Sequence, residues 1–128
     1  MTDSAYIHLV PFVQVYAIVD ADVFPALCHF RWYKKNSTLR HQRINVFRFL
    51  SAPKKNSGKS ISLHRNVADF YGLKWLKIIH FNGNGLDNRL INLVPEFSAM
   101  EGIRRADAIR EYQKTKAIRD YWLTSEDG

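Results

Sequence analysis

The segment from Ile79 to Leu93 constrains the fold of this chain more than any other stretch. A run of β-forming residues at 73–79 leads into His80, and the loop that follows is built from glycines, asparagines and Asp87. Glycine and asparagine tolerate left-handed backbone, and aspartate is a good cap for a helical turn, here one that leads to Asn92. The segment therefore predicts a strand that delivers one histidine into a tight polar loop.

Length and composition indicate one ordinary domain. The 128 residues are 46% hydrophobic and 13% aromatic, which is enough for a core of that size. No apolar run approaches the roughly 20 residues of a spanning helix, so we expect no membrane partner. Residues 1–15 have no basic start, which argues against a signal peptide. Cys28 is the only cysteine, which excludes a disulfide framework and a cysteine-based zinc site, so we expect a protein of the reducing cytoplasm.

Positive charge is concentrated in one interval of the chain. The formal net charge is +7, and no Asp or Glu occurs between Asp22 and Asp69. A polyanion is the natural partner of such an interval, and the alternative is a solvated basic face without a specific ligand. Aromatic residues alternate with the cations, and we expect these rings to pack behind a sheet that presents basic residues to a nucleic-acid backbone: Trp32, Tyr33, Phe47 and Phe49.

Turn signals and periodicity divide the chain into short elements. We expect strands at 14–19, 30–35, 43–50 and 60–63, with turns at 36–37 and 54–58. A short helix is expected after Asp20-Ala21-Asp22, a second one at 64–71 ended by Gly72, and a long basic helix from 97 to about 122. The apolar positions of this last helix follow a helical period only in part: Met100, Ile103, Ala106, Ile109, Ala117, Ile118, Tyr121 and Trp122.

Four motifs occur in a fixed order. They are Ala17-Ile18-Val19-Asp20-Ala21-Asp22, Trp32-Tyr33, Leu63-His64-Arg65, and a last one that runs from His80 through Asn82-Gly83-Asn84-Gly85-Leu86-Asp87-Asn88-Arg89 to Asn92-Leu93. Together they resemble the HNH endonucleases of phages and mobile introns, over roughly 15–101. The resemblance implies an α+β fold: a small antiparallel sheet, a ββα-metal unit and a long C-terminal helix. Residues 1–72 would be the basic, strand-rich part of a single domain, 73–101 the ββα-metal unit, and 102–128 a basic helix and tail.

The resemblance also implies an activity and assigns roles to residues. The activity is metal-dependent nicking or cleavage of double-stranded DNA, in a bacterial host if the chain is phage-encoded. His80 would be the general base in its neutral form, and Asn92 would tie the loop to the histidine strand and hold the ring. Ile79 stands where this branch usually has a metal-binding Asp, and the second ligand position falls at Glu101. Binding of Mg²⁺ or Mn²⁺ would therefore require a rearranged site.

The remaining polar residues carry structural or phosphate-binding expectations. His64, Asp87 and Asn88 are expected to be structural, with Asp87 as a turn cap. Arginine grips an anion in two places, which makes the arginines the better candidates for phosphate contact. The residues expected to bind nucleic acid are Arg31, Lys34, Lys35, Arg40, Arg43, Arg48, Lys54, Lys55, Arg65, Arg89, Arg104 and Arg105.

Three functions are compatible with these observations. The first is a small HNH nuclease, in particular a nickase of the homing or mobile-element type. The second is a degenerate HNH fold that has lost its metal and binds DNA. The third is a phage factor that binds a host protein through the former nuclease surface.

Overall fold

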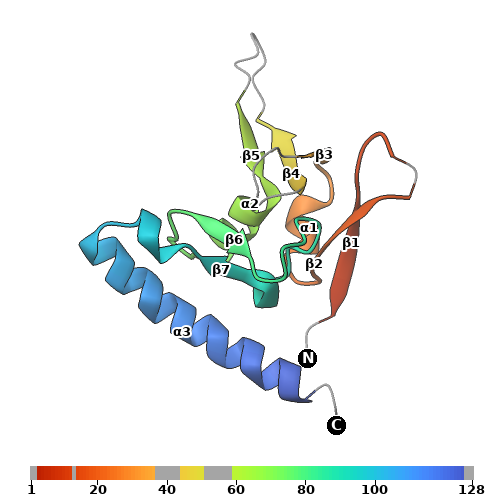
Figure 1. The fold of residues 1–128 in the computed structure, drawn as a ribbon. Coiled ribbons are helices and arrows are strands. Elements are labelled where there is room, and N and C mark those ends of the chain that lie inside the picture. The colour runs from red at the N-terminus through yellow and green to blue at the C-terminus, as the bar shows by residue number, and fades with distance from the viewer. Residues whose placement is uncertain (1–2, 13, 37–43, 51–58, 126–128) are drawn as a thin grey trace.

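Three small antiparallel sheets and a long C-terminal helix make up the described part of the chain (Figure 1). The structure is a computed structural model that describes residues 3–12, 14–36, 44–50 and 59–125. Its strands are β1 (Ser4–His8), β2 (Tyr16–Asp20), β3 (Tyr33–Asn36), β4 (Ile44–Phe49), β5 (Ser60–Ser62), β6 (Ile78–His80) and β7 (Leu93–Pro95). Its helices are α1 (Phe24–Leu27), α2 (Leu63–Phe70) and α3 (Gly102–Ser125), with short 3-10 turns η1 (Leu90–Asn92) and η2 (Phe97–Ala99). The expected α+β class is confirmed.

The sheets meet in one hydrophobic core. β1 pairs with β2, β4 lies between β3 and β5, and β6 pairs with β7, all antiparallel. The indole of Trp32 is fully buried and donates to the carbonyl of Leu27 at 2.9 Å, so its polar atom is satisfied inside the core. Residues from each sheet and from α2 fill the core: Val19, Trp32, Val46, Leu63, Val67, Trp75, Ile78 and Leu93.

Helix α2 connects the three-stranded sheet to the histidine strand. Its buried residues, Leu63, Val67 and Ala68, fall on one side of the helix. Gly72 ends the helical segment with φ of 72°, a left-handed conformation that glycine adopts without steric cost, and its N–H donates to the carbonyl of Asp69 at 3.0 Å. The chain then turns back towards β6.

Helix α3 lies along one side of the molecule beside β7 and η1 (Figure 1). Its buried positions are Ala108, Thr115 and Arg119, with Tyr112 half-buried between them, so the spacing is helical although half of these residues are polar. The apolar positions that follow a helical period only in part are mostly exposed, as at Ile103, which is 82% exposed. The helix contacts the rest of the protein along one edge, where Arg119 donates to the carbonyl of Leu93, whereas Thr115 donates within the helix to the carbonyl of Tyr112.

Three elements differ from the sequence prediction. The strand expected at 73–80 forms only at Ile78–His80, because its partner β7 has only three residues. The helix expected from 97 is interrupted: η2 ends at Ala99 and α3 begins at Gly102. Strand β1 was not predicted. The turn expected at 54–58 lies outside the described residues. In the part of the chain that the structure describes, no helix has the length and apolar character needed to cross a membrane.

Candidate active site

The loop after His80 is closed by asparagine side chains. His80 ends β6, and its backbone pairs with Leu93 of β7. The amide nitrogen of Asn92 donates to Oδ1 of Asn82 at 3.0 Å, and Oδ1 of Asn92 accepts from the backbone N–H of Asn82 at 3.0 Å. Gly83 takes the left-handed conformation that the turn needs, with φ of 77°. Asn92 therefore ties the loop to the end of the histidine strand, as expected.

The His80 ring is oriented by Asn88 and not by Asn92. Nε2 of His80 lies 2.9 Å from Oδ1 of Asn88, which is fully buried. The Asn88 amide nitrogen donates to the carbonyl of Gly85 at 3.0 Å, which fixes the amide with its oxygen towards the ring. Because an amide oxygen only accepts, Nε2 carries the proton and the lone pair of the neutral ring is on Nδ1. The expectation that Asn92 holds the ring is corrected in favour of Asn88.

His64 of α2 supports the other side of the His80 ring. The two rings pack edge to face, with centroids 5.1 Å apart and planes at 80°. Burial lowers the pKa of His64 to about 3, and the charges of His80 and Arg65 act in the same direction. Burial also lowers the pKa of His80, against the opposing effects of the Asn88 hydrogen bond and the Asp87 charge. Both rings are therefore mainly neutral at neutral pH.

Backbone hydrogen bonds hold the loop against β2. The N–H of Ile18 donates to the carbonyl of Leu86 at 2.7 Å, and the carbonyl of Ile18 accepts from Asn88 at 2.8 Å. Two residues further along β2, Oδ2 of Asp20 accepts from the N–H of Leu90 at 2.9 Å, across 70 residues of sequence. Segment 86–90 therefore lies beside β2 like an additional strand.

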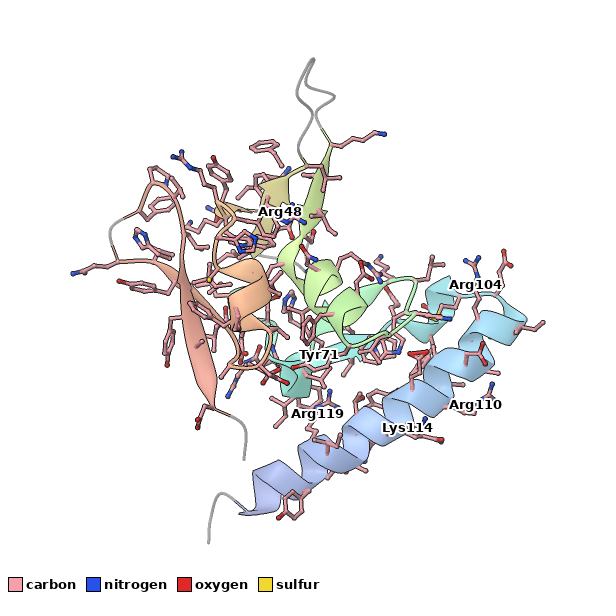
Figure 2. The ribbon with its side chains drawn as sticks, turned by 180° about the vertical axis from the view of Figure 1, so that it is seen from behind. Arg48, Tyr71, Arg104, Arg110, Lys114 and Arg119 are labelled. Carbon is pink, nitrogen blue, oxygen red and sulfur yellow. The ribbon has the colours of Figure 1, made fainter. Side chains whose placement is uncertain are left out.

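Asp20 is buried at this junction, and Oδ2 of its carboxylate accepts two hydrogen bonds. It is 3% exposed, and the hydroxyl of Tyr71 lies 3.2 Å from its Oδ2 and 3.0 Å from Oδ1 of Asp22. Burial raises the pKa of Asp20, while the hydrogen bonds from Leu90 and Tyr71 oppose the rise. Burial and the two carboxylates raise the pKa of Tyr71, so its proton stays on the oxygen. Tyr71, at the end of α2, thus joins the helix to β2 (Figure 2).

Gly85 is the contact between the loop and β4. A Cβ atom at this position would lie 1.9 Å from the carbonyl oxygen of Ile44, which no side chain could accommodate without moving backbone. The loop therefore touches β2 on one side and β4 on the other.

Asp87 and Arg89 form a two-point ion pair inside the loop. Nε of Arg89 lies 2.9 Å from Oδ1 of Asp87, and Nη2 lies 2.8 Å from Oδ2. Oδ1 of Asp87 also accepts from the backbone N–H of Arg89 at 3.3 Å, which is the turn-capping role expected of it. Arg89 was expected to contact phosphate, but its Nε and Nη2 donate to Asp87 within the loop.

The described residues form no ready-made metal site beside His80. Among them, no group of three or more His, Cys, Asp or Glu side chains could hold an ion. Ile79 places an exposed apolar side chain next to His80, and Asp87 is held by its ion pair. Glu101 is an exposed residue just before α3. In the described part of the chain these three side chains therefore do not form a ready-made set of ligands for Mg²⁺ or Mn²⁺.

Arg48 of β4 is half-buried and lies on the side of the sheet that α2 covers. Its Nε donates to Oδ1 of Asn66 of α2 at 3.0 Å, and its guanidinium group lies 3.8 Å from the centre of the Phe30 ring. Figure 2 shows Arg48 among side chains at the base of the three-stranded sheet. Because side chains alternate along a strand, Phe47 and Phe49 face the other way, and Phe49 is 57% exposed. The expected arrangement, with rings behind and cations in front, is reversed on this strand.

Some of the other residues expected to bind nucleic acid donate hydrogen bonds to backbone carbonyls, and others are exposed. Arg65 donates to the carbonyl of Leu76 at 3.0 Å, and Arg105 donates to that of Met100 at 2.9 Å. Arg31, Lys35 and Arg104 are exposed, and Lys34 is half-buried with its Nζ 4.8 Å from the centre of the Phe12 ring. Arg40, Arg43, Lys54 and Lys55 lie outside the described residues.

Arg119 is a buried cation that the sequence analysis missed. It is 2% exposed, donates from Nε to the carbonyl of Ile91 and from Nη2 to that of Leu93 at 2.9 Å, and stacks 5.3 Å from the ring centre of Phe81. It lines a small cavity of about 220 Å³ under the loop. The helical spacing from Thr115 could have indicated that Arg119 lies on the buried edge of α3.

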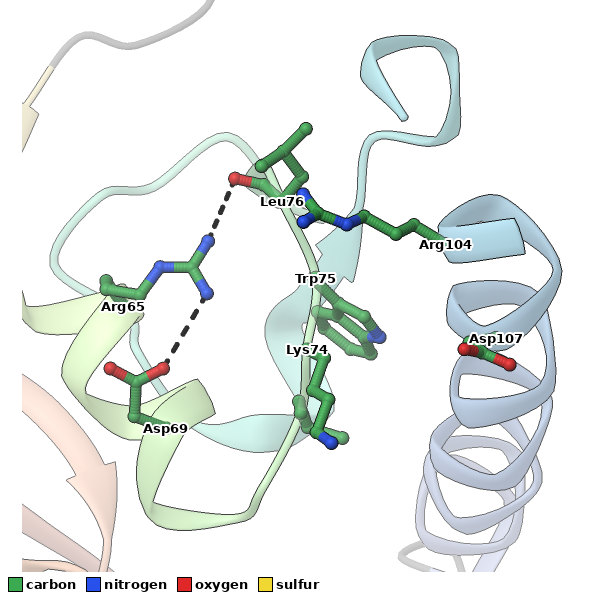
Figure 3. Close-up of a pocket in the computed structure, with 8 residues that line it drawn as sticks. Arg65, Asp69, Lys74, Trp75, Leu76, Arg104 and Asp107 are labelled. Atoms are coloured by element: carbon green, nitrogen blue, oxygen red, sulfur yellow. Dashed lines mark hydrogen bonds and ion pairs between the residues drawn. The ribbon is translucent and has the colours of Figure 1, made fainter. Parts of the chain in front are cut away.

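A larger pocket of about 640 Å³ lies between α2, residues 73–76 and the first turns of α3 (Figure 3). Arg65 spans one side, where it pairs with Asp69 at 3.7 Å and reaches the carbonyl of Leu76. Arg104 and Asp107 line the other side. Three cationic side chains, Arg65, Lys74 and Arg104, and two carboxylates, Asp69 and Asp107, line the pocket.

Comparison with known proteins gives no relative: no family model, no curated protein and no solved structure matches this chain. The arguments about function therefore depend on the geometry of this chain and on its own motifs.

Proposed function

We propose that this chain is an HNH-type DNA endonuclease that nicks DNA with His80 as the general base. The observation that carries the proposal is the contact between His80 and Asn88, in which Nε2 lies 2.9 Å from Oδ1. Oδ1 of Asn88 accepts a hydrogen bond from the protonated Nε2, and no hydrogen bond to Nδ1 occurs among the described residues. The lowered pKa of His80 keeps the ring neutral, so Nδ1 is a basic lone pair at neutral pH.

Phosphodiester hydrolysis uses such a lone pair directly. Nδ1 would take a proton from water, the resulting hydroxide would attack phosphorus, and the bond to the 3′ oxygen would break, with that oxygen taking up a proton from the solvent. His64 and Asn88 would hold the ring while it gains charge, and the nearby Asp87 favours the charged form. General-base catalysis of this kind accelerates a reaction by about 10²- to 10⁴-fold.

The order of elements around His80 also supports the proposal. A strand that ends in the histidine, a polar loop, a second short strand and a helix follow one another as β6, the loop, β7 and α3. This is the order of a ββα-metal unit. Exposed cations at Arg31, Lys35 and Arg104 could position double-stranded DNA through its phosphates.

A second candidate is a catalytically decayed HNH fold that binds DNA or a host protein. Ile79 in place of an acidic residue, and the absence of a metal-binding group among the described residues, favour this candidate. In HNH enzymes the divalent metal neutralises charge on the scissile phosphate and the leaving oxygen. A protein without it would keep the fold and the basic surface but lose the reaction.

Nicking of supercoiled plasmid separates the two candidates. The wild type, His80→Ala and the control His29→Ala would be compared with Mg²⁺, with Mn²⁺ and with a chelator. His29 is an exposed histidine that follows α1, so its replacement should leave nicking unchanged. We expect nicking by the wild type and a loss of about 10²-fold or more in His80→Ala. The rate should rise with pH below the ordinary histidine value of 6.5 and level off above it, because burial lowers the pKa of His80.

Three other outcomes of these assays would contradict the nuclease proposal. Nicking that survives in His80→Ala removes His80 as the base. No nicking under any condition, together with salt-dependent electrophoretic shifts of DNA, supports the decayed DNA-binding fold, because phosphate contacts weaken steeply with salt. Absence of both activities supports a host-protein partner.

A further inference from the structure

Aromatic rings cover one face of the three-stranded sheet. Tyr33 of β3 and Phe47 of β4 are paired directly across the strands, with ring centroids 5.8 Å apart. Phe49, two residues further along β4, lies 5.4 Å from each of these rings, in edge-to-face arrangements. We refer to Tyr33, Phe47 and Phe49 as the aromatic cluster.

The aromatic cluster faces away from the core. The intervening residues of β4 point inward, since Val46 is 1% exposed and Arg48 is bound to Asn66 of α2. Tyr33 and Phe47 are half-buried, whereas more than half of Phe49 is exposed. Three neighbouring rings on an open sheet face are costly to leave in water, which marks such a surface as a binding surface.

Positive charge adjoins the aromatic cluster. Lys35 lies on the same face, with its Nζ 6.0 Å from the ring centre of Phe47. Lys59 is an exposed residue directly before β5. The sequence between Asp22 and Asp69, which includes all three strands of this sheet, has no carboxylate side chain. The surface therefore combines ring faces with cations and has no acidic side chain on its strands.

We propose that the aromatic cluster binds the unpaired bases of single-stranded nucleic acid. Bases stack on exposed aromatic rings with little sequence preference, while neighbouring lysines contact the phosphates. A duplex hides its base faces inside the stack and presents only groove edges and phosphates, so it would leave the rings uncovered. A second copy of this chain also carries a formal net charge of +7, so overall charge opposes its association with this cationic surface. The inference deepens the proposed function and rests on its nucleic-acid partner, but it is independent of the chemistry at His80.

Fluorescence anisotropy with a labelled oligothymidylate tests the proposal, because this strand forms no duplex with itself. Phe49→Ala should weaken binding on the order of tenfold and leave the affinity for a duplex of the same length nearly unchanged. Phe70→Ala is the matched control, because Phe70 is 47% exposed on α2 and outside the aromatic cluster. Phe49→Trp should keep the affinity, and its indole fluorescence should be quenched by the oligonucleotide. Circular dichroism confirms that each variant is folded.

Three results would overturn the inference. These are unchanged single-strand binding in Phe49→Ala, equal weakening of single-strand and duplex binding, and a dimer in sedimentation that Phe49→Ala dissociates. His80→Ala should bind the oligonucleotide as the wild type does. A protein that binds single strands through Phe49 but never nicks DNA contradicts the nuclease proposal alone. A protein that nicks through His80 but binds single strands independently of Phe49 contradicts this inference alone.

Discussion

Acidification from about pH 7.5 to about pH 5 should destabilise the protein through His64. In the folded protein, burial lowers the pKa of this ring from 6.5 to about 3. In the unfolded chain the imidazole has its ordinary value near 6.5. Between these two values the unfolded chain binds a proton that the folded protein does not. The contribution of His64 to stability is therefore complete above the unfolded value and decreases as the pH falls towards the folded one.

The size of the effect follows from the unfolded pKa. A pH of about 5 is about 1.5 units below the pKa of the unfolded ring, and each unit corresponds to about 1.4 kcal/mol. His64 alone therefore lowers the free energy of unfolding by about 2 kcal/mol at that pH. The folded ring is still neutral at that pH, since burial beside His80 and Arg65 keeps its pKa near 3. The lowered pKa of His80 adds a loss of the same sign.

Urea unfolding at both pH values, followed by tryptophan fluorescence, measures this loss. Glutamine does not titrate, so His64→Gln should lose about 2 kcal/mol less than the wild type over the same interval, whatever its stability near pH 7.5. His64→Phe retains an aromatic ring and should show the same reduced dependence. Equal urea slopes would confirm that the proteins expose similar surface on unfolding. If wild type and both variants lose the same free energy, His64 is not buried in its neutral form and the reasoning fails.

Three further substitutions test other contacts of the loop. Gly85→Ala should lower the free energy of unfolding in urea by about 2 kcal/mol or more, because its Cβ would lie 1.9 Å from the carbonyl oxygen of Ile44. The control Gly102→Ala should leave stability unchanged, because its Cβ would meet nothing within 4 Å. Equal stability of the two variants would refute the contact. Asn88→Ala removes the oxygen that accepts the hydrogen bond from Nε2 of His80. The ¹⁵N spectrum of His80 should then change from one tautomer to a mixture, and nicking should fall about tenfold. An unchanged spectrum would show that Asn88 does not set the tautomer. Ile79→Asp adds a carboxylate beside His80 and should increase Mn²⁺ affinity in calorimetry, and a titration identical to that of the wild type would argue against any residual metal site.

The elements that local sequence determines were predicted well. The strands around β4 follow alternation, Gly72 follows the C-terminal cap of α2, and the loop after His80 turns at Gly83, because glycine and asparagine conformations are local properties. Asp87 caps its turn through a neighbour two residues away. The α+β class follows from these elements.

Contacts between distant segments were not predictable from the pattern of residues. Asn88 and Asn92 are chemically identical, and only the folded loop decides that Asn88 faces the His80 ring. Which face of β4 is covered depends on the position of α2, so the side on which Arg48 lies was assigned incorrectly. Arg119 is buried where it donates to carbonyl groups of β7 and η1. One arginine among many cations of a helix does not indicate from sequence that it is the buried one.

The backbone hydrogen bonds of Ile18 and the carboxylate of Asp20 have a consequence for how this protein could be engineered or dissected. The histidine loop is completed by a strand from the first twenty residues, with a tie that spans 70 positions of the chain. A peptide cut out to contain the loop alone would lack that strand, and grafting the loop into another scaffold would require transplanting β2 with it. The chain must also bring these distant segments together during folding, which is typical of slow, high-contact-order folding.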